Sequence, residues 1–354
     1  MTTLKDILIT RIKSDGPITL ADYMVTCLSH PEHGYYATRD PLGAAGDFTT
    51  APEISQMFGE LVGLSLAQTW LDQGAPTPFT LAEAGPGRGT LIADVLRATK
   101  MVPGFHDALR LHLIETSPTL RAKQQATIEK DGINWHTSVQ TLPQKPLFLI
   151  ANEFFDALPI RQFKREGEAW RERLVSVAAT NLTLTWSNPV APAELTHRLT
   201  DTRDDDIVEL HEATISYAAH LGSIINTHGG MALIFDYGDW RSLGDTFQAV
   251  SNHQSIDPCT EPGNADLTAH VDFEALASAA LPAKYSRLTP QGIFLERLGI
   301  TQRAEKLAEN LSGASLNTHV KAYQRLTSPE EMGTLFKVIA LYPDGASPPP
   351  GVEP

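Results

Sequence analysis

The spacing of apolar residues differs between two parts of the chain. Up to about residue 75, apolar residues recur at helical intervals. From Phe79 onward, short apolar runs alternate with segments of helical spacing, a pattern typical of a parallel sheet with crossover helices. We therefore predict a helical N-terminal cap over 1–75 and an α/β domain over 76–343. In the cap, the predicted helices are 4–13, 20–28 and 52–71, with a Gly-containing loop at 41–50.

The α/β domain is predicted to carry two insertions. Segment 161–186 has short alternating runs of Val, Leu, Thr and Trp, which predict an antiparallel hairpin or meander within an insertion of about 161–200. Segment 241–267 is rich in Gly, Pro and Asn and predicts a long loop, within a second insertion of about 241–270. The tail, 344–354, is predicted to be disordered. The predicted strands are 79–84, 110–115, 133–136, 146–151, 231–237 and 335–341, and the predicted helices are 90–98, 119–130, 206–227, 273–280, 294–310 and 316–327.

The composition is that of an ordinary soluble globular protein, with 42% hydrophobic and 20% charged residues. No apolar run approaches the roughly 18 residues that a membrane-spanning helix needs. The first residues do not resemble a signal or transit peptide, so we expect a cytoplasmic protein without membrane insertion. The formal net charge of −14 disfavours nucleic acid as a partner, because acidic surfaces repel phosphates, and favours a basic protein segment.

Neither the cysteines nor the histidines form a recognisable metal or redox motif. Cys27 and Cys259 stand alone, and the 12 histidines include no His-x-x-x-His pair. We therefore predict no structural or catalytic metal.

The most informative segment is the turn Gly85-Pro86-Gly87-Arg88-Gly89, which joins a predicted strand to a predicted helix. Alternate glycines allow a tight turn and a close approach of ligand to backbone, and the helix N-terminus presents unpaired N–H groups. A dinucleotide-binding turn has the spacing Gly-x-Gly-x-x-Gly, whereas the sixth residue here is Thr90. With Glu83 two residues before it, the turn resembles the first motif of class I methyltransferases. That resemblance implies that the three glycines and Thr90 receive the cofactor's methionine and ribose portions, with Glu83 near its amino group.

Glu115 adds to this resemblance. It ends the next predicted strand, where class I methyltransferases carry an acid that accepts hydrogen bonds from the ribose hydroxyls. A carboxylate suits that role because its two oxygens match two neighbouring hydroxyls. We therefore predict S-adenosylmethionine as the cofactor.

Six further segments resemble the MidA family of methyltransferases, and the resemblance runs in order from about residue 5 to 343. It implies a class I, Rossmann-like methyltransferase sheet and a protein substrate. The mitochondrial members of the family symmetrically dimethylate an arginine on a respiratory complex I subunit and assist assembly of the complex; this chain resembles a bacterial relative of them. The segments are 46–55, 151–159, 235–238, 266–273, 292–300 and 332–338.

The resemblance also implies where an arginine would be held, because carboxylates can bind the planar guanidinium fork at two points. Glu153 follows the fourth predicted strand, where class I arginine methyltransferases begin their acidic substrate loop. Asp156 is predicted as a second carboxylate, the alternative being a turn or cap residue before Pro159. Asn152 is predicted to contact the cofactor, and it stands where amine-directed methyltransferases carry Asn-Pro-Pro-Tyr, although both prolines are absent here.

Other candidate site residues lie in the remaining segments. Asp47 and Phe48 are predicted to cover the cofactor, with a plain turn role for Asp47 as the alternative. His270 is predicted as a general base near the acceptor. Asp236 ends a buried strand at the rim where open α/β sheets bind ligands, or it is a hydrogen-bonded structural acid. Asp272 either reaches the acceptor or caps the following helix.

Three other functions stay open on the sequence alone. The chain could bind the cofactor and act mainly as an assembly chaperone, or it could methylate a small molecule beneath a lid formed by 241–267. A dinucleotide oxidoreductase is the third, which Thr90 disfavours.

Overall fold

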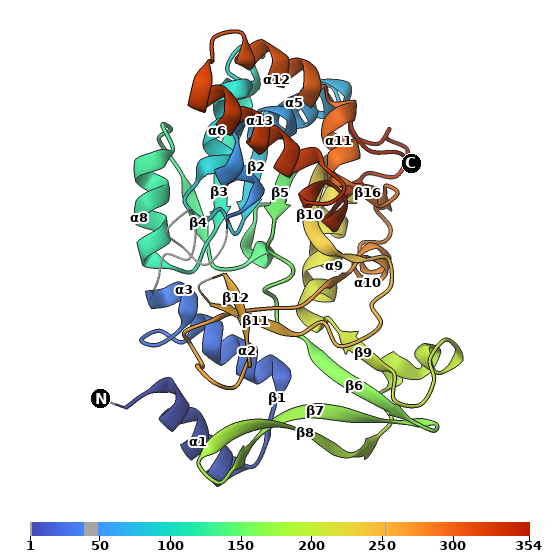
Figure 1. Ribbon diagram of the computed structural model, residues 1–354. Coiled ribbons are helices and arrows are strands. Elements are labelled where there is room, and N and C mark those ends of the chain that lie inside the picture. The colour runs from blue at the N-terminus through green and yellow to red at the C-terminus, as the bar shows by residue number, and fades with distance from the viewer. Residues whose placement is uncertain (1, 39–48, 252) are drawn as a thin grey trace.

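A nine-stranded sheet forms the centre of the computed structural model, which describes residues 2–38, 49–251 and 253–354 (Figure 1). Five of its strands run parallel in the order β4-β3-β2-β5-β10, and β17 lies antiparallel beside β10. This mostly parallel α/β sheet confirms the predicted fold class. The strands are β2 Phe79–Ala84, β3 Leu109–Ile114, β4 Asn134–His136, β5 Leu147–Asn152, β10 Gly230–Asp239, β14 Val271–Asp272, β15 Lys284–Tyr285, β16 Thr289–Pro290 and β17 Phe336–Tyr342.

Alternate residues of the central strands enter two separate apolar layers, because successive side chains of a strand point to opposite faces. Leu81 and Leu113 pack toward α5 (Gln56–Asp72) and α6 (Thr90–Ala98). Ala82 packs in the opposite layer with α9 and α10, whose bounds are Glu212–His228 and Phe273–Ala279. Covering helices on both faces leave the strand ends as the place for a ligand.

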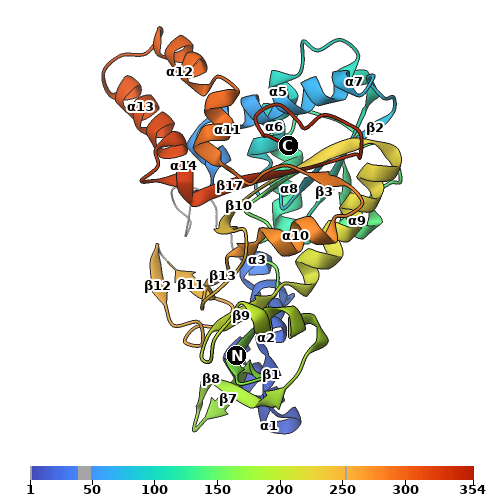
Figure 2. The same cartoon turned by 90° about the vertical axis from the view of Figure 1, so that its right-hand side faces the viewer.

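Several shorter helices complete the central unit. Figure 2 shows α11 to α14 gathered at one end of the central sheet. Among the described residues, no helix combines the length and apolar character needed to cross a membrane. The remaining helices of this unit are α4 Ala51–Ile54, α7 Phe105–Ala108, α8 Pro118–Thr127, η1 Val139–Thr141, α11 Gln291–Arg297, α12 Ile300–Ala308, α13 Gly313–Thr327 and α14 Met332–Leu335.

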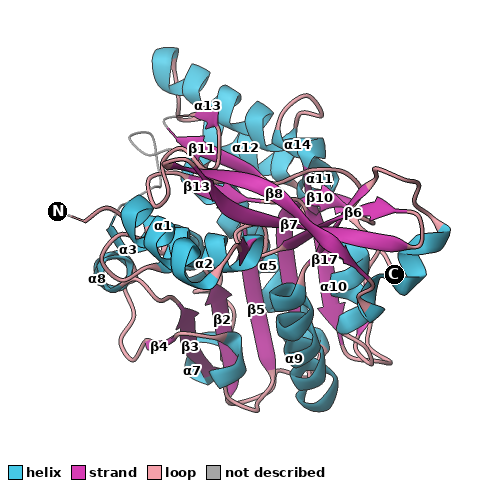
Figure 3. Ribbon diagram, turned by 90° about the horizontal axis from the view of Figure 1, so that it is seen from below, coloured by secondary structure: helices cyan, strands magenta, loops and turns pink. Residues whose placement is uncertain are grey.

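A second, antiparallel sheet lies below the central one in Figure 1, and Figure 3 shows β7 and β8 crossing in front of the central strands. It contains the meander predicted at 161–186, and the N-terminal helices pack on it through Leu8, Tyr23 and Val175. The β-insertion and the N-terminal cap therefore share one core. The elements are α1 Leu4–Asp15, β1 Ile18–Thr19, α2 Leu20–Ser29, α3 Tyr35–Thr38, β6 Arg161–Glu166, β7 Ala169–Ala178, β8 Asn181–Val190, η2 Ala193–Thr200 and β9 Ile207–Leu210.

Two predicted segments differ from the structure because strand pairing decides their conformation. The helix predicted at 206–227 begins instead with β9, which pairs with β6, and α9 follows. The loop predicted at 241–267 contains a small sheet in the order β12-β11-β13. Its strands are β11 Gln248–Ser251, β12 Gln254–Ile256 and β13 Asp266–Thr268.

Two predicted helices and the tail also differ. The helix predicted at 52–71 breaks at Ser55, whose hydroxyl accepts from the N–H of Met57 and caps α5. The helix predicted at 294–310 breaks at Gly299, which has a φ of 91°. The tail at 344–354 is packed rather than disordered, since the carbonyl of Pro350 accepts from Ser65 Oγ at 2.8 Å.

Candidate active site

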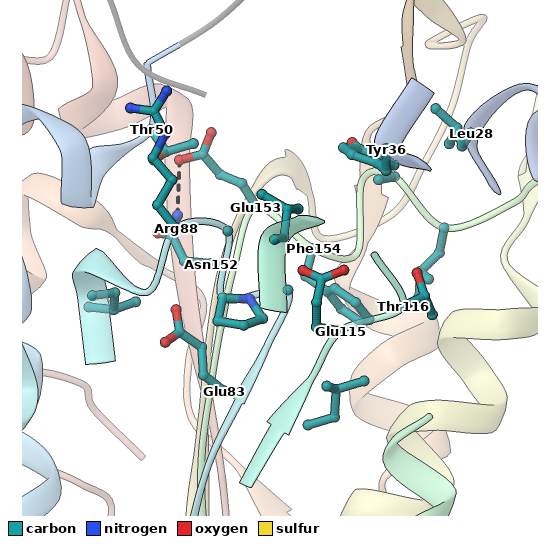
Figure 4. A pocket seen from close by; sticks show the side chains of 18 of the residues that line it. Leu28, Tyr36, Thr50, Glu83, Arg88, Glu115, Thr116, Asn152, Glu153 and Phe154 are labelled. Atoms are coloured by element: carbon teal, nitrogen blue, oxygen red, sulfur yellow. Dashed lines mark hydrogen bonds between the residues drawn. The ribbon is translucent and has the colours of Figure 1, made fainter. Parts of the chain in front are cut away.

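A cavity of about 400 Å³ lies at the carboxyl ends of β2, β3 and β5. Glu83, Glu115 and Glu153, which stand at these strand ends, are among the side chains that line it (Figure 4). Leu28 from α2 and Tyr36 from α3 line the cavity from the N-terminal unit. The structure thus brings together residues that are far apart in the sequence, at the sheet edge where open α/β folds bind ligands.

The predicted glycine turn forms one wall of this cavity. Gly85, Gly87 and Gly89 have φ angles of 65°, 51° and 85°, a region that other residues rarely adopt. At Gly85, an added Cβ would lie 2.8 Å from Cδ2 of Phe154, so a side chain there meets an occupied position. The turn therefore needs glycine and presents bare backbone to the cavity, which suits a ligand that approaches closely.

Glu83 and Thr90 flank the turn. Glu83 is buried and lines the cavity, and its Oε2 has no hydrogen-bond partner among the described residues. Burial raises the pKa of Glu83 to about 8. Burial disfavours the charged form of this carboxylate. A ligand that brings a positive charge or a hydrogen-bond donor, such as an amino group, would stabilise the charged form. Thr90 donates from Oγ1 to Oε1 of Glu53 at 2.6 Å, which ties α4 to the start of α6.

Glu115 is held in place by two donors. The N–H of Ser117 donates to its Oε1 at 2.7 Å, and Nε2 of Gln124 donates to its Oε2 at 3.2 Å. Burial raises the pKa of Glu115. Each carboxylate oxygen can accept a further bond, so this fixed pair of acceptors fits a diol that enters the cavity.

Gln124 connects Glu115 to the glycine turn and was not predicted from the sequence. Its Nε2 also donates to the carbonyl of Gly87 at 2.8 Å, and its Oε1 accepts from Nε1 of Trp135 at 2.9 Å. The side chain is fully buried. A buried glutamine within α8 carries no sequence motif, so this positioning role is visible only in the structure.

Glu153 has an unusual backbone and a shielded carboxylate. Its φ is 52°, and its Oε1 accepts from the N–H of Ala51 at 3.3 Å and from Nδ2 of Asn152 at 3.0 Å (Figure 4). Shielding by the surrounding protein, together with the charge of Asp156, raises the pKa of Glu153 to about 8. The Oδ1 of Asn152 has no partner among the described residues. These groups can accept donors from a cation and are costly to leave unpaired.

Asp156 and His270 line a second cavity, of about 740 Å³, which also contains Glu153. His270 does not line the first cavity, and its ring contacts Tyr237 with centroids 5.3 Å apart. Burial lowers the pKa of His270. The three catalytic candidates therefore differ in position. Asp156 and His270 line only the second of these two cavities, whereas Glu153 lines both.

Asp236 and Asp272, for which the sequence allows either a role at the site or a structural role, both make structural contacts. Asp236 accepts from the backbone N–H groups of Phe155, Asp156 and Tyr237 at 3.0 to 3.2 Å, and so fixes the loop that carries Glu153. Asp272 caps α10, accepting from the N–H of Ala275 at 2.8 Å.

The last two predictions from the sequence concern the loop residues Asp47 and Phe48 and the presence of a metal site. Asp47 and Phe48 lie outside the described residues. Within 2–38, 49–251 and 253–354, no group of three or more His, Cys, Asp or Glu side chains is arranged to hold a metal ion.

Comparisons with known proteins identify the family. Residues 61–291 match a family described as S-adenosyl-L-methionine-dependent methyltransferases. The mitochondrial protein arginine methyltransferase NDUFAF7 homolog of Drosophila melanogaster is 36% identical to this chain, over 94% of this chain and 83% of its own length. Human NDUFAF7, also a mitochondrial protein arginine methyltransferase, is 35% identical over 94% and 82%.

A solved structure agrees with these sequence relatives. A candidate methyl transferase from Burkholderia thailandensis, crystallised with S-adenosyl-homocysteine, is 28% identical to this chain with a TM-score of 0.84. The match covers 98% of this chain and 93% of that protein. The predicted resemblance is confirmed: the chain belongs to the MidA-like family of S-adenosylmethionine-dependent methyltransferases.

Proposed function

We propose that this protein is a protein-arginine N-methyltransferase. The observation that carries the proposal is Glu153, a shielded carboxylate in the wall shared by the two cavities. The first cavity suits the cofactor, and the second leaves a separate approach for the methyl acceptor. Relatives that are 35 to 36% identical over most of the chain are named arginine methyltransferases, which supports the same acceptor.

The residues around the first cavity fit the cofactor of this family. S-adenosylmethionine, when bound, supplies a methyl group that is already activated on its sulfonium. We propose that Glu83 receives the amino group, that Glu115 accepts from the ribose hydroxyls, and that the glycine turn and Thr90 lie against the methionine and ribose portions. Asn152 lies at the end of β5 beside Glu153, where its Oδ1, which no described residue contacts by a hydrogen bond, can accept from the cofactor or the acceptor.

Replacing Gln124 with Leu is expected to weaken binding of S-adenosylhomocysteine about tenfold, because Glu115 and the carbonyl of Gly87 each lose a donor. Isothermal titration calorimetry measures the dissociation constant. The matched control is Gln162→Leu, another fully buried glutamine, which donates to Glu209 in the second sheet. If both variants bind like the wild type, Gln124 does not position the cofactor site.

The acceptor chemistry assigns clear tasks to Glu153 and Asp156. Their carboxylates hold the guanidinium at two points and keep its charge away from the attacking nitrogen. The nitrogen becomes acidic as it gains the methyl group, and Glu153 can take up the proton that it loses. His270 lines the second cavity but not the first, so it stays a proposed general base on the acceptor side.

The rate of methylation should rise with pH at low acceptor concentration and saturating cofactor. The pKa of Glu153 is raised to about 8, so its carboxyl is largely neutral in the acid range and gains the charge that attracts a cation as the pH rises. We expect the midpoint at or below about 8, because the positive sulfonium of the saturating cofactor lowers this pKa. Initial rates measured from pH 5.5 to 9 test this. A wild-type profile that falls with rising pH would contradict the assignment.

Transfer of labelled methyl groups in a cell lysate separates the competing functions. With methyl-labelled S-adenosylmethionine, we expect a labelled protein band that is absent with Gly87→Val. Label confined to small molecules would support a small-molecule methyltransferase instead. Cofactor binding without any transfer would support an assembly chaperone.

We further propose that the acceptor is an arginine of a respiratory complex I subunit, as the MidA resemblance implies, and that it is dimethylated symmetrically. The net charge of −14 supports a basic protein segment as the partner. Mass spectrometry of purified complex I from cells with and without this protein tests the proposal. Identical arginine methylation in both samples would contradict it.

A further inference from the structure

The second cavity shares part of its lining with the first. Both cavities share Tyr36 and Glu153, so a group that enters the second cavity meets the cofactor cavity at the same side chains. The other walls come from the end of β10, from β11 and β13, and from α13 and α14. The small sheet that the sequence did not predict is therefore one wall of this cavity.

Acidic side chains dominate the charge of the second cavity. Glu153, Asp156 and Asp266 line it, while Arg325 is its one Lys or Arg among the described residues and is exposed on α13. Asp156 and Asp266 are both more than nine-tenths buried. The Oδ1 of Asp156 has no hydrogen-bond partner among the described residues, so a donor from outside the chain would satisfy it. The cavity is therefore suited to a cation.

Asp266 is held in a defined orientation by the residue that the two cavities share. The hydroxyl of Tyr36 donates to its Oδ1 at 2.8 Å. The charges of Asp156 and Asp266 both act to raise the pKa of Glu153, which is consistent with the three carboxyls acting on one ligand charge. The contact joins α3 to β13 at a side chain, Tyr36, that lines both cavities.

Apolar side chains occupy the part of the lining formed by the C-terminal elements. Met332, Leu335 and Phe336 line the second cavity, and Leu335 is 53% exposed. An aliphatic stem can pack on such a surface while the charged group at its tip reaches the acids. A cavity with acids in one part of its lining and apolar side chains in another matches a long cationic side chain better than a small compact cation.

We infer that the second cavity receives the acceptor side chain, and that Asp266 is a specificity-determining residue that selects a guanidinium on an aliphatic stem. This inference rests on the proposed arginine methylation and adds a further acid and a surface for the aliphatic stem. Tyr36 is a positioning residue, because it acts through Asp266. Neither Asp266 nor Tyr36 was among the residues predicted from the sequence.

A bisubstrate probe tests the inference without relying on turnover. The probe is an adenosine derivative with a guanidine tethered at its 5′ carbon, and the outer guanidine nitrogen carries a butyl chain that represents the arginine stem. A matched compound carries urea, which has the same shape but no charge. Calorimetry gives the preference, defined as the ratio of the urea dissociation constant to the guanidine dissociation constant.

The wild type should prefer the guanidine probe by about tenfold or more. Asp266→Asn should reduce that preference about fivefold while leaving the affinity for S-adenosylhomocysteine unchanged, and Asp266→Glu should restore part of it. Tyr36→Phe should reduce the preference by a smaller factor. The control Asp344→Asn removes an exposed charge that lines neither cavity, and the preference should stay at the wild-type value.

Two outcomes separate this inference from the proposed function. If the wild type binds both probes equally, the guanidinium acceptor itself is wrong. If the preference disappears in Glu153→Gln but stays intact in Asp266→Asn, arginine methylation stands and the role of Asp266 is overturned.

Discussion

Replacing Gly87 with Val is expected to abolish binding of S-adenosylmethionine and S-adenosylhomocysteine, and with it all methyl transfer. Gly87 lines the cofactor cavity with a φ of 51°, where a β-branched residue is strongly disfavoured. The new side chain also meets the space in which the cofactor lies against bare backbone. Calorimetry with S-adenosylhomocysteine measures the loss, and circular dichroism confirms that the variant is folded.

The control for this variant is Gly167→Val. Gly167 has a similar φ of 61° and nothing within 4 Å of an added Cβ, and it lines neither cavity. The backbone strain of the two variants is therefore comparable, while only Gly87→Val changes the cofactor site. Wild-type affinity in Gly87→Val would show that the cofactor does not lie on this turn.

Replacing Glu153 with Gln should lower kcat/KM for the protein acceptor by about 100-fold or more, because a shielded cation loses its partner charge. The amide keeps the size of the side chain and can still accept from the N–H of Ala51. Binding of S-adenosylhomocysteine should therefore be retained. Initial rates of label transfer and calorimetry together measure the two effects.

Glu60→Gln is a matched control for Glu153→Gln. Glu60 is a buried glutamate on α5 that pairs with Arg97 and Arg303, and it lines neither cavity. Its loss should affect stability and leave the rate of transfer by the folded enzyme near the wild-type value. Equal transfer rates in Glu153→Gln and wild type would remove Glu153 from the acceptor site.

The sequence predicts the parts of the fold that depend on local pattern. β2 and α6 have the predicted bounds, because a buried apolar run and a glycine turn mark the end of one and the start of the other. The gathering of Glu83, Glu115 and Glu153 was also predictable, since the carboxyl ends of neighbouring parallel strands share one edge of the sheet.

The parts that were missed depend on contacts between distant segments. Tyr36 and Asp266 are 230 positions apart, and no local pattern joins them. The strands β11 to β13 lie in a segment rich in Gly, Pro and Asn, residues that are uncommon in strands. Hydrogen-bonded pairing of these strands with one another stabilises them in spite of this composition. Gln124 donates to the carbonyl of Gly87 and to Glu115. The packing of α8 places it there, and no local sequence pattern indicates this position.

We propose above all that this enzyme transfers a methyl group to an arginine nitrogen of a protein. The most direct measurement is amino-acid analysis of the acceptor band labelled by the wild-type enzyme, after acid hydrolysis. We expect the label to elute as methylated arginine. Label that elutes as methylated lysine or histidine, or that is lost on mild alkaline treatment as a carboxyl methyl ester, would contradict the account.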